Sequence, residues 1–235
     1  ITFRVHGVIL PMPQNHRERT MKRLMIILFL LMIPFLGFGQ EKVSVNTLLQ
    51  KIQNYTSTVR TFTANFVYVV NKKTYQGVLY YKAPNKFAME YSSGNRMLSD
   101  GKVLWIVIKD QNIAIRENLE KTKTATPITG WNIQRLQKEY IPFLPKDYAV
   151  MFRGKQAYRI EFKPKSTLSA FRYIEFVVSP EGQIQRMVAR NQLGREVQLE
   201  LSYTGFNMSL GEDRFLYEPD ENTYIFDDIL ISTPS

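Results

Sequence analysis

The sequence predicts a mainly β protein with a smaller helical part, an α+β fold. We expect a curved or partly closed antiparallel sheet of about eleven strands, with helices over one face. Three observations support this. Alternating apolar and polar residues recur from Thr61 to Tyr203, with turn signals between the runs. The connections are too short for parallel crossovers, so neighbouring strands pair antiparallel. Two amphipathic segments interrupt the pattern as helices.

The first element is a helix behind a candidate N-cap at Ser44. Apolar residues follow at steps of three and four, which places them on one side of a helix. These residues are Val45, Leu48, Leu49, Ile52 and Tyr55. Such a one-sided stripe is typical of a helix that lies across a hydrophobic surface.

Strands come next, and the first runs from Thr61 to Val70. Side chains alternate between the two faces of a strand, so one face carries Phe62, Ala64, Phe66, Tyr68 and Val70. Further strands are predicted over residues 75–82, 86–91, 96–99, 103–109 and 111–117. Turn signals separate them, including Pro84-Asn85, Ser93-Gly94 and Asp100-Gly101.

A second helix is predicted after Pro127, before the prolines at 142 and 145. Its apolar stripe consists of Ile128, Trp131, Ile133, Leu136 and Tyr140. Strands then resume over residues 148–153, 156–163, 171–179, 183–190 and 195–203, and a last short strand is expected at 214–217.

The N-terminal part has the layout of a signal peptide. Lys22 and Arg23 precede an uncharged apolar run, and small glycines at 37 and 39 fit cleavage before Gln40. The run is shorter than the roughly 20 residues of a spanning helix, although an uncleaved anchor is the alternative. We therefore interpret residues 1–20 as upstream sequence, 21–39 as the signal peptide, and 40–235 as a single exported domain.

Composition narrows the chemistry of that domain. Both histidines, His6 and His16, precede the apolar run, and the chain has no cysteine. Thiolate nucleophiles, imidazole bases and nearly all transition-metal sites are thereby excluded from residues 40–235. These residues include 26 basic and 20 acidic side chains, a net charge of +6. Because export argues against nucleic acid, the basic surface fits acidic partner proteins or anionic headgroups, or it serves only solubility.

The remaining polar motifs have structural interpretations. Asp100-Gly101 is a turn, and the acidic pairs at 220–221 and 227–228 are solvated tail charges. Serine pairs lack a histidine partner, and no glycine-rich loop resembles a phosphate cradle. We expect no enzyme activity, no cofactor and no metal, and a function in binding.

Several segments resemble the periplasmic outer-membrane lipoprotein carrier family LolA. The first is residues 77–87 (GVLYYKAPNKF), and the second is 97–105 (MLSDGKVLW). Further similarity lies at 171–176 (FRYIEF), the Glu181-Gly182 hairpin and Phe215. The likeness spans roughly residues 44 to 218, and the order and spacing of its pieces are more specific than any one of them.

The resemblance implies an incomplete antiparallel β-barrel closed by an α-helical lid around a hydrophobic cavity. It also implies a function. Such a carrier takes acylated lipoproteins from an inner-membrane ABC transporter and passes them to an outer-membrane acceptor, whose identity the sequence leaves open. We expect a monomer that does not bind nucleic acid.

The resemblance also assigns lipid-binding residues, which on the residue pattern alone are equally consistent with an ordinary core. Inward-facing strand positions are Phe62, Phe66, Leu79, Tyr81, Phe87, Met89, Tyr91 and Met97. The underside of the lid is Leu48, Leu49 and Ile52, with Ile128, Ile133 and Leu136 in its second part. Methionines suit this purpose because thioethers adapt to irregular chains.

One position departs from the family pattern. The family usually has an arginine before the proline at 84, which hydrogen-bonds the lid backbone and holds the closed state, whereas this chain has Ala83. Lys82 is adjacent but points to the opposite face. Either another group latches the lid, with Arg60, Arg96 and Arg135 as candidates, or the lid closes less tightly. We hypothesise the weaker closure.

Three other functions remain as alternatives. The same fold could be a periplasmic carrier of glycolipid or pigment intermediates, in which the cavity persists but the cargo differs. It could also be the lipid-sensing module of an envelope-stress regulator, which usually carries a further domain. An enzyme would need a convergent polar site, which the sequence does not show.

Overall fold

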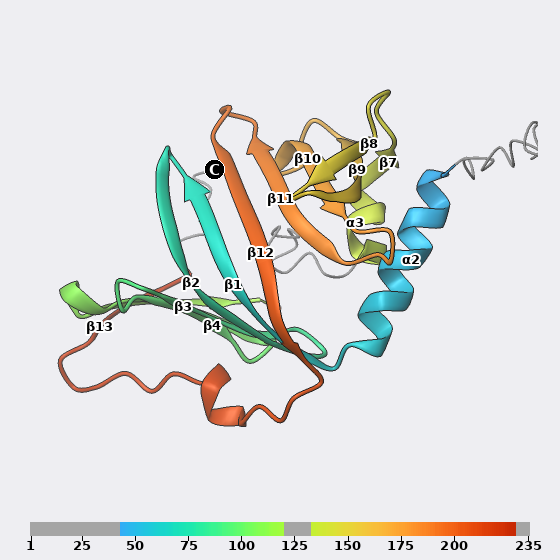
Figure 1. Cartoon of the computed structure of the whole chain (residues 1–235). Coiled ribbons are helices and arrows are strands. Elements are labelled where there is room, and N and C mark those ends of the chain that lie inside the picture. Colours follow the sequence, from blue (N-terminus) through green and yellow to red (C-terminus); the bar gives the residue numbers. More distant parts are fainter. Residues whose placement is uncertain (1–42, 120–132, 229–235) are drawn as a thin grey trace, which may run out of the picture. The chain divides into compact units, whose positions relative to one another are not determined.

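The computed structural model describes residues 43–119 and 133–228, which belong to one compact unit (Figure 1). Its α-helices are α2 (Val45–Thr58) and α3 (Ile133–Glu139), and its 3-10 helices are η1 (Lys109–Gln111) and η2 (Glu212–Phe215). Its strands are β1 (Thr61–Val70), β2 (Lys73–Lys82), β3 (Lys86–Tyr91), β4 (Arg96–Ser99), β5 (Val103–Ile108), β6 (Ile113–Asn118), β7 (Tyr140–Phe143), β8 (Ala149–Phe152), β9 (Lys155–Pro164), β10 (Phe171–Val178), β11 (Ile184–Asn191), β12 (Glu196–Phe206) and β13 (Tyr224–Asp227).

All the strands join one curled sheet, in the order β13-β6-β5-β4-β3-β2-β1-β12-β11-β10-β9-β7, with β8 also paired to β9. Short turns enforce antiparallel pairing. At the β1–β2 turn, Asn71 and Lys72 both have positive φ, which gives a hairpin its preferred twist. Strand β1 pairs with β12 from the far end of the chain, and this pairing unites the two halves of the sheet.

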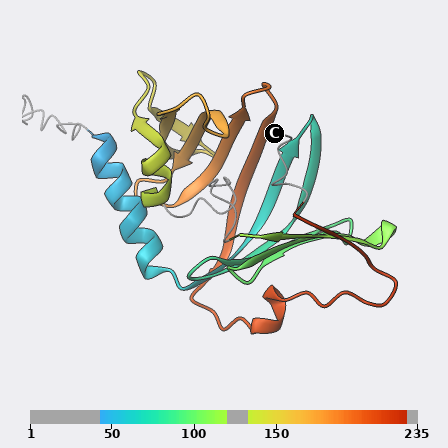
Figure 2. The same ribbon diagram turned by 180° about the vertical axis from the view of Figure 1, so that it is seen from behind.

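Register gives the sheet two distinct faces. We call inner the face on which the helices pack. It carries Ala64, Leu79 and Met89, which pair in line across β1 to β3. Helices α2 and α3 lie side by side against the β9–β11 half of the sheet, as Figure 2 shows. The mainly β fold with an open, curled sheet is therefore confirmed.

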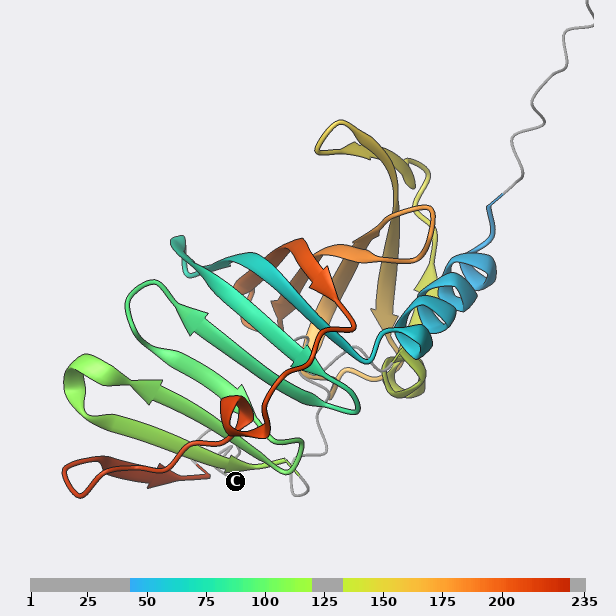
Figure 3. The same ribbon diagram turned by 60° about the horizontal axis from the view of Figure 1, so that its bottom comes forward.

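The outer face is covered in part by the C-terminal segment. After β12 the chain crosses β2 to β5, where Phe215 of η2 is buried against Ala88, Leu98 and Val107 (Figure 3). It then adds β13 to the sheet, parallel to β6. In the described residues, no helix is both long and apolar enough to span a membrane.

Three details of the predicted secondary structure are wrong. Tyr140 does not end a helix but begins β7, where Pro142 is tolerated because the strand lies at the edge of the sheet. Residues 214–217 are not a strand, since η2 turns through residue 215. Strand β13 lies in the presumed tail, so the sheet has 13 strands and not about eleven. Ile128 and Trp131 lie outside the described residues.

Candidate functional site

The inner face of the sheet is continuously apolar. Its strand positions in the β1–β3 region are Phe62, Ala64, Phe66, Leu79, Phe87 and Met89, all at most 4% exposed. Tyr81, Tyr91 and Met97 are half-buried beside them. The opposite half of the sheet contributes Phe162, Ile174 and Phe176 to the same cluster. The alternation of residue types along each strand thus produces one apolar surface that spans both halves.

Helix α2 closes this surface. Ser44 caps it, since its hydroxyl oxygen accepts the Thr47 N–H at 3.0 Å. The buried underside of α2 consists of Leu48, Leu49 and Ile52. In α3, Ile133 and Leu136 join the same cluster. The structure therefore brings together all the residues assigned to lipid binding within the described part of the chain, whereas Ile128 lies outside it.

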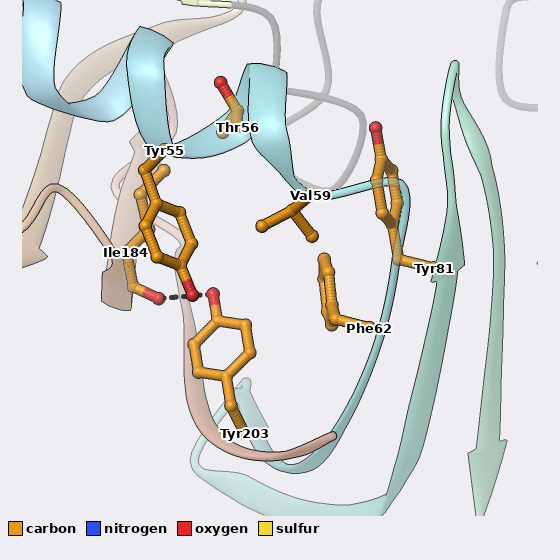
Figure 4. A pocket seen from close by; sticks show the side chains of 7 residues that line it. All are labelled: Tyr55, Thr56, Val59, Phe62, Tyr81, Ile184 and Tyr203. Atoms are coloured by element: carbon orange, nitrogen blue, oxygen red, sulfur yellow. Dashed lines mark hydrogen bonds between the residues drawn. The ribbon is translucent and has the colours of Figure 1, made fainter. Parts of the chain in front are cut away.

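A small pocket lies at the C-terminal end of α2, and Figure 4 shows its lining. The lining residues are Tyr55, Thr56, Val59, Phe62, Tyr81, Ile184 and Tyr203. Its cavity volume is about 20 Å³, room for about one water molecule. Two hydrogen bonds border it. The Tyr203 hydroxyl donates to the Ile184 carbonyl at 2.7 Å, and the Gln183 amide donates to the Tyr55 hydroxyl at 2.9 Å.

Aromatic rings pack together at this end of the interior. The Phe62 ring stacks on Tyr81 with centroids 4.9 Å apart and meets Tyr203 at 5.1 Å. Burial raises the pKa of Tyr203 well above its ordinary value and also raises the pKa of Tyr55 and Tyr81. These phenols therefore stay neutral, and the pocket presents no charge to a ligand.

A second, larger opening lies on the inner face at the other end of β1. It is lined by Tyr68, Val70, Tyr75, Tyr91, Asn95, Arg96, Met97, Ile106, Val107 and Ile108, and its volume is about 170 Å³. We call it the open groove. Burial is also the first cause of the raised pKa of Tyr68 and Tyr91. The groove is smaller than the ~300–1,000 Å³ of typical ligand pockets.

Sequence reasoning missed several lining residues. Tyr68 and Val70 belong to the same alternating face as Phe62, so that pattern could have identified them. Tyr203 alternates with Leu201 on β12, but nothing in its neighbourhood predicts that β12 lies beside β1. Tyr55 belongs to the predicted helix stripe, but its bond to Gln183 joins residues 128 apart in sequence.

The structure shows where two of the three candidate latch arginines lie. Arg60 takes part through its backbone, since its N–H donates to the Asn207 side chain and its carbonyl accepts from Ala83. Arg96 lines the open groove, and the side chain of Arg135 lies outside the described residues. Lys82 points to the outer face, where its ammonium contacts Glu212 at 2.7 Å. Asn207 also donates to the Thr58 carbonyl at 3.4 Å.

Helix α2 packs closely against Gly182, in the β10–β11 turn. A Cβ atom placed on Gly182 would lie 2.4 Å from the backbone carbon and oxygen of Lys51. The helix backbone therefore rests directly on this turn. Together with the hydrogen bonds of Gln183 and Asn207, this contact fixes the closed position of α2.

The chemistry available to this site is apolar binding. Among the residues described, no group of three or more His, Cys, Asp or Glu side chains could hold a metal ion. The interior offers aromatic rings, branched chains and thioethers to a ligand, which favour hydrocarbon. In the closed arrangement the space beneath α2 is too small for an acyl chain, so binding there requires the helix to move.

Comparison with known proteins agrees with this fold. Residues 57–218 match the family model described as outer membrane lipoprotein carrier protein LolA. A search of curated protein sequences finds no match. An uncharacterized conserved protein from Thermus thermophilus is similar in structure, with a TM-score of 0.52 and 12% identity over 77% of this chain and 98% of that chain.

Two further solved structures are more distant. A putative outer membrane lipoprotein-sorting protein domain from Vibrio parahaemolyticus has a TM-score of 0.39 and 12% identity, over 71% of this chain and 95% of that one. The Mycobacterium tuberculosis lipoprotein LppX has a TM-score of 0.44 and 10% identity, over 72% and 98%. The Thermus likeness supports the fold alone, and these two lower scores add nothing to it.

Proposed function

Since this chain belongs to the outer membrane lipoprotein carrier protein LolA family, we propose that it is a periplasmic carrier. It binds the acyl chains of lipoproteins on the inner face of its sheet and moves them from the inner to the outer membrane. The observation that supports this most is the uninterrupted apolar face beneath α2, a helix held by packing and a few hydrogen bonds.

The energetics of the cargo explain why such a face is needed. Each buried CH₂ of an acyl chain is worth ~0.8 kcal/mol, so a multiply acylated protein cannot cross an aqueous compartment with its chains exposed. An apolar interior offsets this cost only if it admits the chains. The proposed cycle therefore includes displacement of α2, which exchanges helix-to-sheet contacts for lipid-to-sheet contacts.

Opening need not break many polar contacts. Displacing the end of α2 costs the Tyr55–Gln183 hydrogen bond and the bonds that Asn207 makes to Thr58 and Arg60. Each contributes about 1 kcal/mol net. Most of the remaining cost is the exposure of Leu48, Leu49 and Ile52, which lipid would cover again. The lid is thus expected to open only where lipid is supplied.

The partners follow from this cycle. We propose that an inner-membrane ABC transporter supplies the acylated lipoprotein and that an outer-membrane acceptor takes it. Residues 21–39 are proposed to direct export, with residues 40–235 as the working carrier.

Binding of a fluorescent triacylated peptide tests the site. Met97→Glu places a carboxylate at the open groove and should weaken binding by at least about tenfold, because burying an unpaired charge is costly. Thr74→Glu adds the same charge at an exposed β2 position and should bind as wild type. Equal loss in both variants would contradict the proposed site.

Native mass spectrometry of the protein recovered from the periplasm tests the cargo. A co-purified acylated lipoprotein supports the proposal. Free lipid or glycolipid would instead make it a carrier of a different cargo, and a bound protein without acyl chains would favour a sensing module. Recovery with none of these, together with no binding of the triacylated peptide, would overturn the function.

A further inference from the structure

Positive charge is concentrated at one end of the sheet. Three segments lie there: the β1–β2 turn (71–73), the β9–β10 loop with the start of β10 (165–172), and the β11–β12 turn with its flanks (190–196). Together they contain six basic residues and one acidic residue. We call them the basic rim. Their excess of five charges nearly equals the net +6 of residues 40–235.

The three segments are neighbours in space. The Gln192 amide donates to the Ser169 carbonyl at 2.9 Å, which joins the β11–β12 turn to the β9–β10 loop. Pairing of Val70 with Val197 brings the β1–β2 turn beside the β11–β12 turn. Figure 1 shows these two turns at the same end of the sheet.

Several cations of the basic rim are available to a partner. Lys72, Lys73, Arg172 and Arg195 are exposed. Arg190 is paired with Glu196 at 2.6 Å, so the one acid of the rim neutralises one cation. Lys165 donates to the Gln137 carbonyl, close to Glu139 at the end of α3. Even with this acid counted, the rim remains strongly positive.

The turns at the opposite ends of the same strands carry no such excess. They are residues 83–85, 100–102, 153–155, 179–183 and 207–212, and they contain three basic and three acidic residues. At the rim end, the turns 92–95 and 109–112 are neutral as a pair, and the segment 218–223 that leads into β13 carries three acidic residues beside β6, at the opposite edge of the sheet from β9. The positive charge is therefore localised on the basic rim, away from the acidic segment beside β6, and it can orient the rim toward an anionic surface.

Two leucines project from the basic rim. Leu168 is 93% exposed and Leu193 is 80% exposed, the two highest values among large hydrophobic side chains in the described part of the chain. Both stand on ordered turns. The Leu168 N–H donates to the Ser166 hydroxyl oxygen, and Asn191 accepts from both Gly194 and Arg195. Exposed apolar tips within a cationic field suit the interface of an anionic bilayer.

We infer that the basic rim docks this domain on anionic phospholipid surfaces, with Leu168 and Leu193 entering the headgroup boundary and the cations meeting the headgroups. A bilayer fits better than an acidic protein because separate projecting tips can enter a soft surface without a shaped pocket on the partner. The open groove reaches the same end of the sheet, since Val70 and Tyr75 flank the β1–β2 turn.

The docking has a consequence for the proposed function, on which this part of the inference rests. A bilayer at the basic rim lies beside the mouth of the open groove. An acyl chain could then pass between bilayer and inner face with little exposure to water.

Flotation of residues 40–235 with lipid vesicles tests the inference, since residues from Val43 onward form one compact unit. Binding should be strong with vesicles that contain phosphatidylglycerol, weak with phosphatidylcholine alone, and reduced by salt. The double variant Arg172→Gln/Arg195→Gln should bind on the order of 25-fold more weakly, from about fivefold for each charge removed. Lys102→Gln/Lys155→Gln, which removes two exposed cations at the other end, should bind as wild type.

A separate pair of variants tests the contribution of Leu168 and Leu193. Leu168→Ser/Leu193→Ser should weaken vesicle binding even at low salt, whereas Leu216→Ser, at a side chain 51% exposed on the C-terminal segment, should not. No preference for phosphatidylglycerol, or equal losses in rim and control variants, would overturn the inference, as would rim-dependent capture of an acidic protein without lipid affinity.

The triacylated-peptide assay in solution separates this inference from the function. Rim variants should bind the peptide as wild type does. If the protein binds the peptide but not the vesicles, the docking surface is wrong and the carrier function stands. If it binds the vesicles but not the peptide, the carrier function is wrong and the docking surface stands.

Discussion

At the residue scale, Gly182 decides how closely α2 can approach the sheet. Its φ of +98° favours glycine, and a Cβ there would meet the Lys51 backbone at 2.4 Å. Gly154 provides a matched position, with φ of +74° and nothing within 4 Å of its Cβ. The two glycines thus separate backbone strain from collision with the helix.

We predict that Gly154→Ala lowers the free energy of unfolding by about 1 kcal/mol, from strain alone. Gly182→Ala should cost at least about 2 kcal/mol more, because the new methyl group displaces α2. Hydrogen exchange measured by mass spectrometry should accelerate in α2 for Gly182→Ala only. Similar exchange in the two variants would show that the helix does not rest on this turn.

Glu212 gives a pH dependence at the residue scale. Hydrogen bonds from Lys82 and Lys86 lower the pKa of its carboxyl group from 4.5 to about 2. A carboxyl whose pKa is lowered on folding stabilises the fold above the unfolded value and loses that effect as the pH falls. The contribution is therefore complete above pH 4.5 and disappears between pH 4.5 and about 2.

We predict that Glu212→Gln lowers stability at neutral pH and has progressively less effect as the pH falls from 4.5 to about 2. Urea unfolding of both proteins across this range measures the difference. A difference that stays constant down to the lowest pH of this range would mean that the lysine contacts do not stabilise the fold.

At the element scale, Phe215 is the one buried side chain of the described C-terminal segment, which ion pairs of Glu212 and Arg214 also hold on the outer face. Phe215 is 1% exposed, whereas its neighbour Leu216 is 51% exposed. Phe215→Ala should cost about 3–5 kcal/mol and expose residues 207–228 to protease, because the cavity left cannot close over Leu98. Leu216→Ala should change stability by less than about 0.5 kcal/mol. Resistance to protease in the Phe215 variant would show that β13 and the ion pairs of Glu212 and Arg214 suffice to anchor the segment.

Most of the strands could be predicted from the sequence. Strands β1 to β6 and β8 to β12 follow from alternation and turn residues, because each has one face in a core. Strand β7 was missed because Pro142 normally ends an element, and only a place at the edge makes it compatible with pairing. All four residues of β13 are exposed, so no burial pattern marks them, and its pairing with β6 is non-local.

Part of the candidate site could also be predicted from the sequence, because it follows from local residue patterns. Leu48, Leu79 and Met89 lie where helix stripe and strand alternation place them. The Tyr55–Gln183 contact and the Tyr203 wall of the pocket depend on which distant strands become neighbours, which no local pattern encodes. The family resemblance indicated a cavity, but the small closed volume under α2 could only come from the packed structure.

At the scale of the whole molecule, the closure of α2 over the sheet can be tested at position 83. Ala83 replaces the expected arginine, and its N–H donates to the Arg60 carbonyl. We predict that Ala83→Arg slows hydrogen exchange in α2 by about tenfold or more and lengthens lipid retention, since a charged hydrogen bond contributes about 1.5–3 kcal/mol. Ala83→Leu, which adds apolar bulk without the guanidinium, should change neither. Unchanged exchange and retention in Ala83→Arg would contradict the weaker closure proposed for this chain.

The pairing of β1 with β12 also governs how the chain reaches its native state. Phe62 finds its neighbour Phe206 only after more than half of the polypeptide has emerged, so contact order is high and folding is expected to be slow. Until then β1 presents a bare row of amide and carbonyl groups beside an apolar surface, which is the type of edge that aggregates. A translation product that stops short of residue 196 lacks β12 altogether, and it should be recovered as an insoluble or chaperone-bound species.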